Sequence, residues 1–106
     1  MNKFMRILIF FDLPVTSKQQ RKVATQFRSF LLKDGYTMVQ YSIYSRVCNG
    51  YDAVSKHKER IYKNLPDNGS VRLLVLTEKQ YSSIEILVGK LTTGEGPEPY
   101  EQLSIY

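Results

Sequence analysis

Residues 5–14 have the sequence MRILIFFDLP, an apolar run that ends in a carboxylate and a proline. Between Ile7 and Phe11 every side chain is apolar, so both sides of an expected strand are apolar. A strand of this kind is buried above and below. Pro14 cannot continue a ladder of strand hydrogen bonds, so we expect the strand to span residues 5–13.

Further helices and strands are expected downstream of this strand. Ser17 and Gln20 have the spacing of a capping box and open the first helix. Gly35 supplies the left-handed stop of that helix. The remaining expected elements are a strand over residues 36–47, a helix over 52–64, a strand over 71–77, a short polar connection over 78–83 and a strand over 84–88.

The order of these elements fits a ferredoxin-like split βαβ sheet, a mixed α/β (α+β) fold, with the connection at residues 78–83 as a reduced crossover. Helices cover one face of such a sheet, yet the strands at residues 5–13 and 71–77 are apolar on both faces. A second copy of the sheet is the simplest cover, so we expect a homodimer. We expect one domain over residues 1–90. Residues 91–106 would form a linker and a C-terminal strand, which needs a sheet edge of its own chain or of its partner.

The composition favours a polyanionic partner. The chain has 106 residues and a net charge of +5, and nucleic acid is the first candidate for a small basic domain. A solvated basic surface is the alternative. One cysteine and one histidine exclude a structural zinc site by ligand count. We see no signal peptide and no membrane-spanning run, so we expect a cytoplasmic protein without a membrane partner.

Asp12 is the main candidate for a functional residue. An acid at the end of a buried strand is either a turn-former or a metal ligand. Mg²⁺ takes one or two carboxylates together with waters and substrate phosphates, and a two-fold dimer could bring two copies of Asp12 to one axis. His57 is expected on a helix surface and lacks an obvious partner, so it is a poor general-base candidate. Candidate phosphate contacts, with an exposed or interface surface as the alternative, are Lys18, Arg21, Lys22, Ser42, Tyr44 and Arg46.

Four segments together resemble a known family of small proteins. They are residues 7–14, 21–24, 39–44 and 74–81, and they resemble the CRISPR-associated adaptation family "Cas two" over about residues 4–89. The resemblance implies a ferredoxin-like protomer and a homodimer joined sheet to sheet. It also implies that the C-terminal strand adds to the sheet of the partner.

The resemblance further implies a role in CRISPR adaptation. The dimer would bridge two dimers of the "Cas one" integrase and bind the backbone of duplex DNA, both pre-spacer and CRISPR repeat, during the capture of new spacers. The alternative is a magnesium-dependent endonuclease, on single-stranded RNA or on duplex DNA, in antiviral defence, and a toxin-like interferase is a third possibility. Asp12 matches the magnesium-binding acid of the family and would be the catalytic residue of a nuclease. The dimer axis would hold one Mg²⁺ or Mn²⁺ ion. Tyr44 matches an aromatic position near the site, and Arg21 with Lys22 the basic pair.

Overall fold

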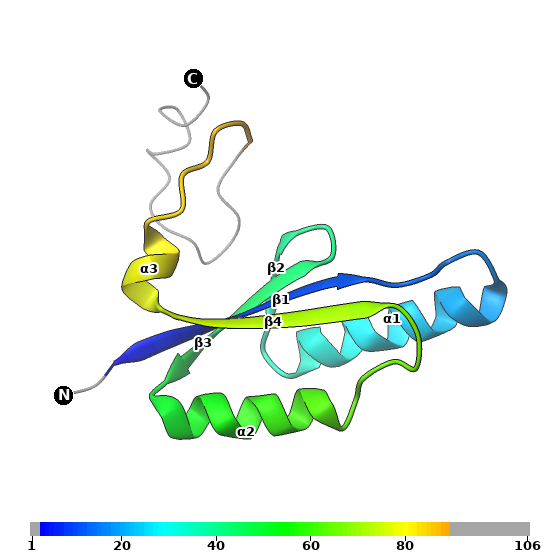
Figure 1. Cartoon of the computed structure of the whole chain (residues 1–106), viewed down its shortest axis with the longest axis horizontal. Helices are drawn as coiled ribbons and strands as arrows, with labels where there is room; N and C mark the ends of the chain where they lie inside the picture. The colour runs from blue at the N-terminus through cyan, green and yellow to red at the C-terminus, as the bar shows by residue number, and fades with distance from the viewer. Residues whose placement is uncertain (1–2, 90–106) are drawn as a thin grey trace.

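A four-stranded antiparallel sheet forms the centre of the protein, and its computed structural model describes residues 3–89 (Figure 1). The strand order is β2-β3-β1-β4, which is that of a ferredoxin-like fold and confirms the expected mixed α+β class. None of the helices in the described part is long and apolar enough to cross a membrane. The elements are β1 Phe4–Asp12, α1 Lys18–Lys33, β2 Thr37–Gln40, β3 Ile43–Asn49, α2 Tyr51–Tyr62, β4 Ser70–Thr77 and α3 Glu78–Ser82.

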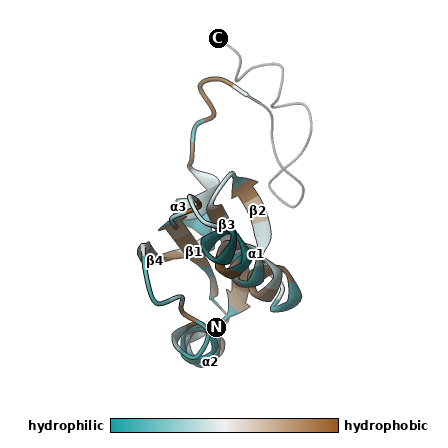
Figure 2. Cartoon of the chain, turned by 90° about the vertical axis from the view of Figure 1, so that its right-hand side faces the viewer, coloured by the Kyte–Doolittle hydropathy of each residue, from teal (hydrophilic) through white to brown (hydrophobic). Residues whose placement is uncertain are grey.

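β1 lies between β3 and β4, and its side chains point alternately to the two faces of the sheet. Its side chains from Met5 to Phe11 at odd positions are buried in the core that α1 and α2 complete. Phe11 packs edge-on against Phe27 of α1, with ring centroids 5.2 Å apart. Figure 2 shows hydrophobic residues along the strands and hydrophilic ones over much of both long helices. These helices therefore cover one face of the sheet.

The opposite face carries the even positions of β1. Arg6 pairs in register with Val47 and Leu76, and Leu8 with Ser45 and Leu74. We call the apolar part of this surface the open face: Leu8, Phe10, Ile43, Val47, Leu74 and Leu76. Val47 and Leu74 are exposed in the protomer. An apolar open face is what the dimer hypothesis requires, and the homodimer stays a prediction.

Arg6 is buried at the start of this face and is fully engaged. Its Nε and Nη2 donate to the carboxylate of Glu78 at 2.9 and 2.6 Å, and its Nη1 donates to Ser45 Oγ at 3.2 Å. Its guanidinium lies 4.2 Å from the ring centroid of Tyr81. These contacts attach α3 to the sheet beside the start of β1 (Figure 1).

Capping boxes begin two of the helices. In α1 the Gln20 backbone N–H donates to Ser17 Oγ at 3.0 Å, and the Ser17 backbone N–H donates to Gln20 Oε1 at 3.1 Å. The predicted box is therefore confirmed. Thr77 and Gln80 form the same pair at α3, which occupies the region expected as a short connection.

The single strand expected over residues 36–47 is wrong: this region forms the β2–β3 hairpin. Gln40 ends β2, Ile43 begins β3, and Tyr41 with Ser42 makes the turn. Ser42 is the one non-glycine residue with positive φ, 66°, within residues 3–89. A serine gives a weaker turn signal than glycine or asparagine, so the sequence did not reveal the break. The extra strand completes the βαββαβ order.

The strand expected over residues 84–88 is also wrong. These residues follow α3 without forming a strand, and Ile84, Leu87 and Val88 are exposed. An apolar run becomes a strand only where a sheet edge pairs with it, and β4 is followed by α3 instead. The expected linker and C-terminal strand at residues 91–106, and their addition to a partner's sheet, lie outside the described residues.

His57 requires a further correction, because it is 3% exposed and has a partner. Its Nδ1 donates to Asp34 Oδ2 at 2.9 Å, while Arg60 Nη1 donates to Asp34 Oδ1 at 2.6 Å. Burial raises the pKa of Asp34, but the hydrogen bonds and charges of His57 and Arg60 outweigh burial and hold that pKa below its ordinary value. The cluster connects the end of α1 to α2.

Candidate functional site

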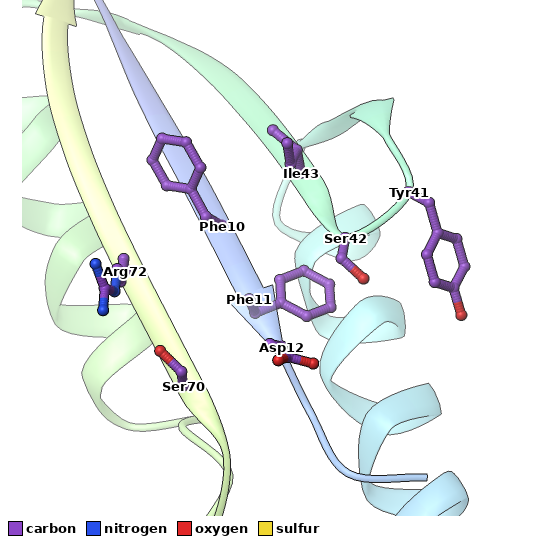
Figure 3. Close-up of a pocket in the computed structure, with 8 residues that line it drawn as sticks. All are labelled: Phe10, Phe11, Asp12, Tyr41, Ser42, Ile43, Ser70 and Arg72. Atoms are coloured by element: carbon purple, nitrogen blue, oxygen red, sulfur yellow. The ribbon is translucent and has the colours of Figure 1, made fainter.

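An open hollow of about 540 Å³ lies at the C-terminal end of β1, around Asp12 (Figure 3). The Asp12 side chain is exposed. Within residues 3–89 its carboxylate has no hydrogen bond and no ion pair. The hollow is lined by Phe10, Phe11, Asp12, Tyr41, Ser42, Ile43, Ser70 and Arg72.

The backbone at Phe11 and Asp12 is held on both sides although the Asp12 carboxylate has no partner in this part of the chain. On one side the Phe11 N–H donates to the Ser42 carbonyl oxygen at 3.0 Å. On the other side Ser70 of β4 lies opposite Asp12 in register. Gly69 has φ +92° and approaches so closely that an added Cβ would lie 2.7 Å from the Asp12 carbonyl oxygen. The fold therefore fixes where the carboxylate starts, and it leaves the carboxylate oxygens without a partner within residues 3–89.

Ser42, one of the predicted phosphate contacts, lines the hollow. Its positive φ is a sparsely populated conformation for serine, of the kind that occurs at binding sites. The predicted residues Lys18, Arg21 and Lys22 are exposed in the first turns of α1 and do not line the hollow. Arg21 Nη1 donates to the Val15 carbonyl oxygen at 3.1 Å.

Two predicted contacts have structural roles instead. Tyr44 is 3% exposed and stacks on Phe11 at 5.7 Å, so its ring is part of the core and offers no surface to a phosphate. Arg46 Nε donates to the Asp34 carbonyl oxygen at 2.8 Å, which caps the end of α1. Arg46 pairs in register with Ile7, which lies five residues before Asp12 on β1. The backbones of Arg46 and Asp12 are therefore about 16 Å apart along the strand direction.

Three residues near the site were not singled out from the sequence: Ser70, and Arg28 and Arg72, which counted only among the basic residues spread over the chain. Ser70 and Arg72 line the hollow because β4 is antiparallel to β1, and only the register shows this. Arg28 reaches the rim from α1, where its Nη2 donates to Tyr41 Oη at 3.0 Å. Its position next to Phe27, at the border of the apolar face of the helix, was the available signal.

The comparison with protein families is decisive. The family described as CRISPR associated protein Cas2 matches residues 5–84, three quarters of the chain. The chain belongs to the Cas2 family. Residues 5–84 contain β1 from its second residue to Asp12, the β2–β3 turn and β4, so every residue of the hollow lies within the match.

Relatives with curated names support this membership. The chain is 58% identical over 85 residues to the CRISPR-associated endoribonuclease Cas2 of Acidovorax ebreus, covering 80% of this chain and 83% of the relative. It is 40% identical over 105 residues to the protein of that name from Campylobacter jejuni, covering 99% and 73%. The corresponding protein of Flavobacterium psychrophilum is 39% identical over 100 residues, covering 94% and 86%.

The donor set of the hollow suits a hard cation. Carboxylate, hydroxyl and carbonyl oxygens are the ligands that Mg²⁺ and Mn²⁺ prefer, and Mg²⁺ keeps waters and substrate phosphates in its other positions. The described part of the chain has no group of three His, Cys, Asp or Glu residues that could hold a metal ion. One protomer thus provides a single carboxylate, which fits an ion shared with a second protomer and a phosphate.

Proposed function

We propose that this Cas2 chain is a metal-dependent endoribonuclease that cleaves a phosphodiester bond at Asp12. The observation that carries the proposal is an exposed carboxylate, without a partner within residues 3–89, at the end of the central strand. The names of the relatives support the reaction class, since each is called an endoribonuclease.

Two protomers would complete the centre. Asp12 has the same parity on β1 as Leu8 and Phe10, so it lies at the end of the open face. Stacking two open faces about a two-fold axis would cover Val47 and Leu74, which are exposed in the protomer. The same packing would bring two copies of Asp12 toward one axis, where they would share one Mg²⁺ or Mn²⁺ ion.

Each of these residues of the hollow would have a separate role. Asp12 would hold the ion, and Ser42 and Ser70 would donate hydroxyl hydrogen bonds to the phosphate. Arg72, exposed beside them, would supply a positive charge. A bound Mg²⁺ ion would polarise the phosphoryl oxygen and lower the pKa of the attacking water. The buried pair of His57 and Asp34 faces the helices and takes no part.

Cleavage of a labelled single-stranded RNA in Mg²⁺ by the purified dimer tests this proposal. We expect Asp12→Asn to lower the rate by about a hundredfold or more, since metal coordination supplies several kcal/mol of transition-state stabilisation. Asp52→Asn is the matched control, because Asp52 is an exposed aspartate in the first turn of α2. An Asp12→Asn protein that cleaves like the control would refute the proposal.

A second candidate function rests on the basic start of α1. Lys18 and Lys22 are exposed on a chain of net charge +5, which suits contact with the backbone of duplex DNA. In this function the dimer would bridge dimers of the CRISPR integrase while new spacers are captured. Replacing both lysines with glutamine should weaken duplex binding and reduce its salt dependence while RNA cleavage at Asp12 continues. Unchanged duplex binding would argue against this function.

A further inference from the structure

Tyr41 is an exposed aromatic residue at the rim of the Asp12 hollow. Tyr41 is 75% exposed, and it lies in the two-residue turn between β2 and β3. In Figure 3 Tyr41 stands at the outer edge of the group, above α1, while Asp12 lies at the end of β1. Both residues line the same hollow. A large ring this exposed gains little from burial in the protomer, so packing does not explain its place.

Arg28 holds this ring in position. Its Nη2 donates to Tyr41 Oη at 3.0 Å, and its guanidinium lies 4.9 Å from the centroid of the Tyr41 ring. The same guanidinium lies 5.6 Å from the centroid of Phe11, the residue before Asp12. Arg28 thus connects the exposed ring to the strand that carries the carboxylate.

The fold leaves Arg28 incompletely satisfied. Its Nε is buried and has no hydrogen-bond partner among the described residues. A buried donor without a partner is unfavourable. Because Arg28 orders the Tyr41 side chain before a ligand binds, binding to the ring would cost less side-chain entropy.

We propose that Tyr41, ordered by Arg28, is a stacking platform for an unpaired nucleobase next to the Asp12 site. Aromatic rings stack on bases of single strands, and the bases of a duplex are already stacked on one another. The inference deepens the proposed function, because the platform would place the phosphate beside that base at Asp12. It makes Tyr41 a residue that discriminates single strands from duplexes, and Arg28 a positioning residue that acts through Tyr41.

The test measures binding without metal, so that cleavage plays no part. Wild-type dimer and variants are titrated in EDTA against a labelled single-stranded RNA decamer and against a duplex RNA of the same length, with fluorescence anisotropy as readout. We expect Tyr41→Ala to weaken single-strand binding about tenfold and duplex binding less than about twofold. Tyr51→Ala is the matched control: Tyr51 is 66% exposed and begins α2, outside the residues that line the hollow.

A decamer that contains 2-aminopurine distinguishes stacking from general affinity. Its fluorescence should be quenched on binding to wild type and to Tyr41→Phe, which keeps the ring, and remain high with Tyr41→Ala. Arg28→Lys, which keeps the charge but not the planar group, should weaken single-strand binding about threefold through loss of ring order. Circular dichroism checks that each variant is folded.

Equal loss of single-strand and duplex binding in Tyr41→Ala, or no loss, would overturn the inference, as would quenching that persists without the ring. These outcomes are separate from failure of the proposed function. If Asp12→Asn still cleaves RNA while Tyr41→Ala loses single-strand binding, the nuclease proposal fails and the platform stands. If Asp12→Asn stops cleavage and Tyr41→Ala binds normally, the nuclease proposal stands and the platform inference fails.

Discussion

The two ends of β1 use charge in opposite ways. Arg6 and Asp12 lie on the same side of the strand, six residues apart. Arg6 is 8% exposed, and its hydrogen bonds to Glu78 and Ser45 attach α3 to the sheet. Asp12 is exposed, and within residues 3–89 its carboxylate has no partner. One end of the strand uses its charge to build the fold, and at the other end the described fold leaves the charge unpaired, as the proposed metal site requires.

The two charges should differ in whether their removal affects folding or binding. A buried charge with complete hydrogen bonding is a structural element, and its loss should appear in stability. A charge that the fold positions by its backbone but does not pair should appear in binding instead.

The largest effect is expected at Arg6. Arg6→Met keeps the apolar stem but leaves Glu78 and Ser45 without their donor, so we expect the free energy of unfolding to fall by about 3 kcal/mol. Urea unfolding at fixed protein concentration measures this loss of stability. Arg72→Met is the matched control, since Arg72 is exposed on the same face, and it should cost less than about 0.5 kcal/mol. Equal costs for the two variants would break the comparison.

Gly69 should matter because it supports the backbone of Asp12. An added Cβ meets the Asp12 carbonyl oxygen at 2.7 Å and the Leu13 Cα at 3.1 Å, so the chain must move. With the penalty for positive φ, Gly69→Ala should cost about 2–3 kcal/mol. Gly50→Ala isolates the contact: Gly50 has φ +90°, and nothing lies within 4 Å of the place that its methyl group would take. Thermal unfolding of both variants should show the larger loss at Gly69, and equal losses would mean that the close approach is unimportant.

Asp34 should contribute stability that depends on pH. Its pKa is lowered from 3.8 in the folded chain, because the hydrogen bonds from His57 and Arg60 outweigh burial. A lowered pKa gives stability that is present above pH 3.8 and is lost as the pH falls through the folded pKa. At pH 7 we expect Asp34→Asn to cost about 1–2 kcal/mol. Urea unfolding from pH 7 to pH 2 should show this cost shrinking below pH 3.8, whereas a constant cost would exclude a role for the charge.

Local patterns predicted most of the fold. The apolar run of β1, the capping box at Ser17 and the double-sided apolar strand β4 all correspond to observed elements. The sequence did not predict the β2–β3 turn for two reasons. Ser42 adopts positive φ without being a glycine, and the alternation of apolar and polar residues from Val39 to Ile43 continues across the break. Tertiary hydrogen bonds, which no local pattern encodes, bring residues such as Phe11 and Ser42 together.

The candidate site was less predictable. Asp12 could be selected from the sequence because an acid at the end of an apolar strand is chemically distinctive, and Ser42 because its hydroxyl lies on the polar side of an expected strand. For Arg28 the sequence offers only its place beside Phe27 at the border of the apolar helix face, and the packing of α1 beside the turn is what brings it to Tyr41. Tyr44 was expected on an exposed or interface side of its strand, but the register of β3 with β1 places it opposite Ile9, on the core side of the sheet. Strand parity alone did not reveal which face the helices would cover.

The most direct test of the central claim compares wild type with Asp12→Asn by urea unfolding in EDTA and in Mg²⁺ at one protein concentration. We predict stabilities within about 0.5 kcal/mol in EDTA, because the carboxylate has no structural partner in the described chain. Mg²⁺ at about a hundred times its Kd should stabilise wild type by about 2.7 kcal/mol and leave the variant unchanged. Equal stabilisation of both proteins, or an Asp12→Asn protein that is already unstable in EDTA, would contradict the account.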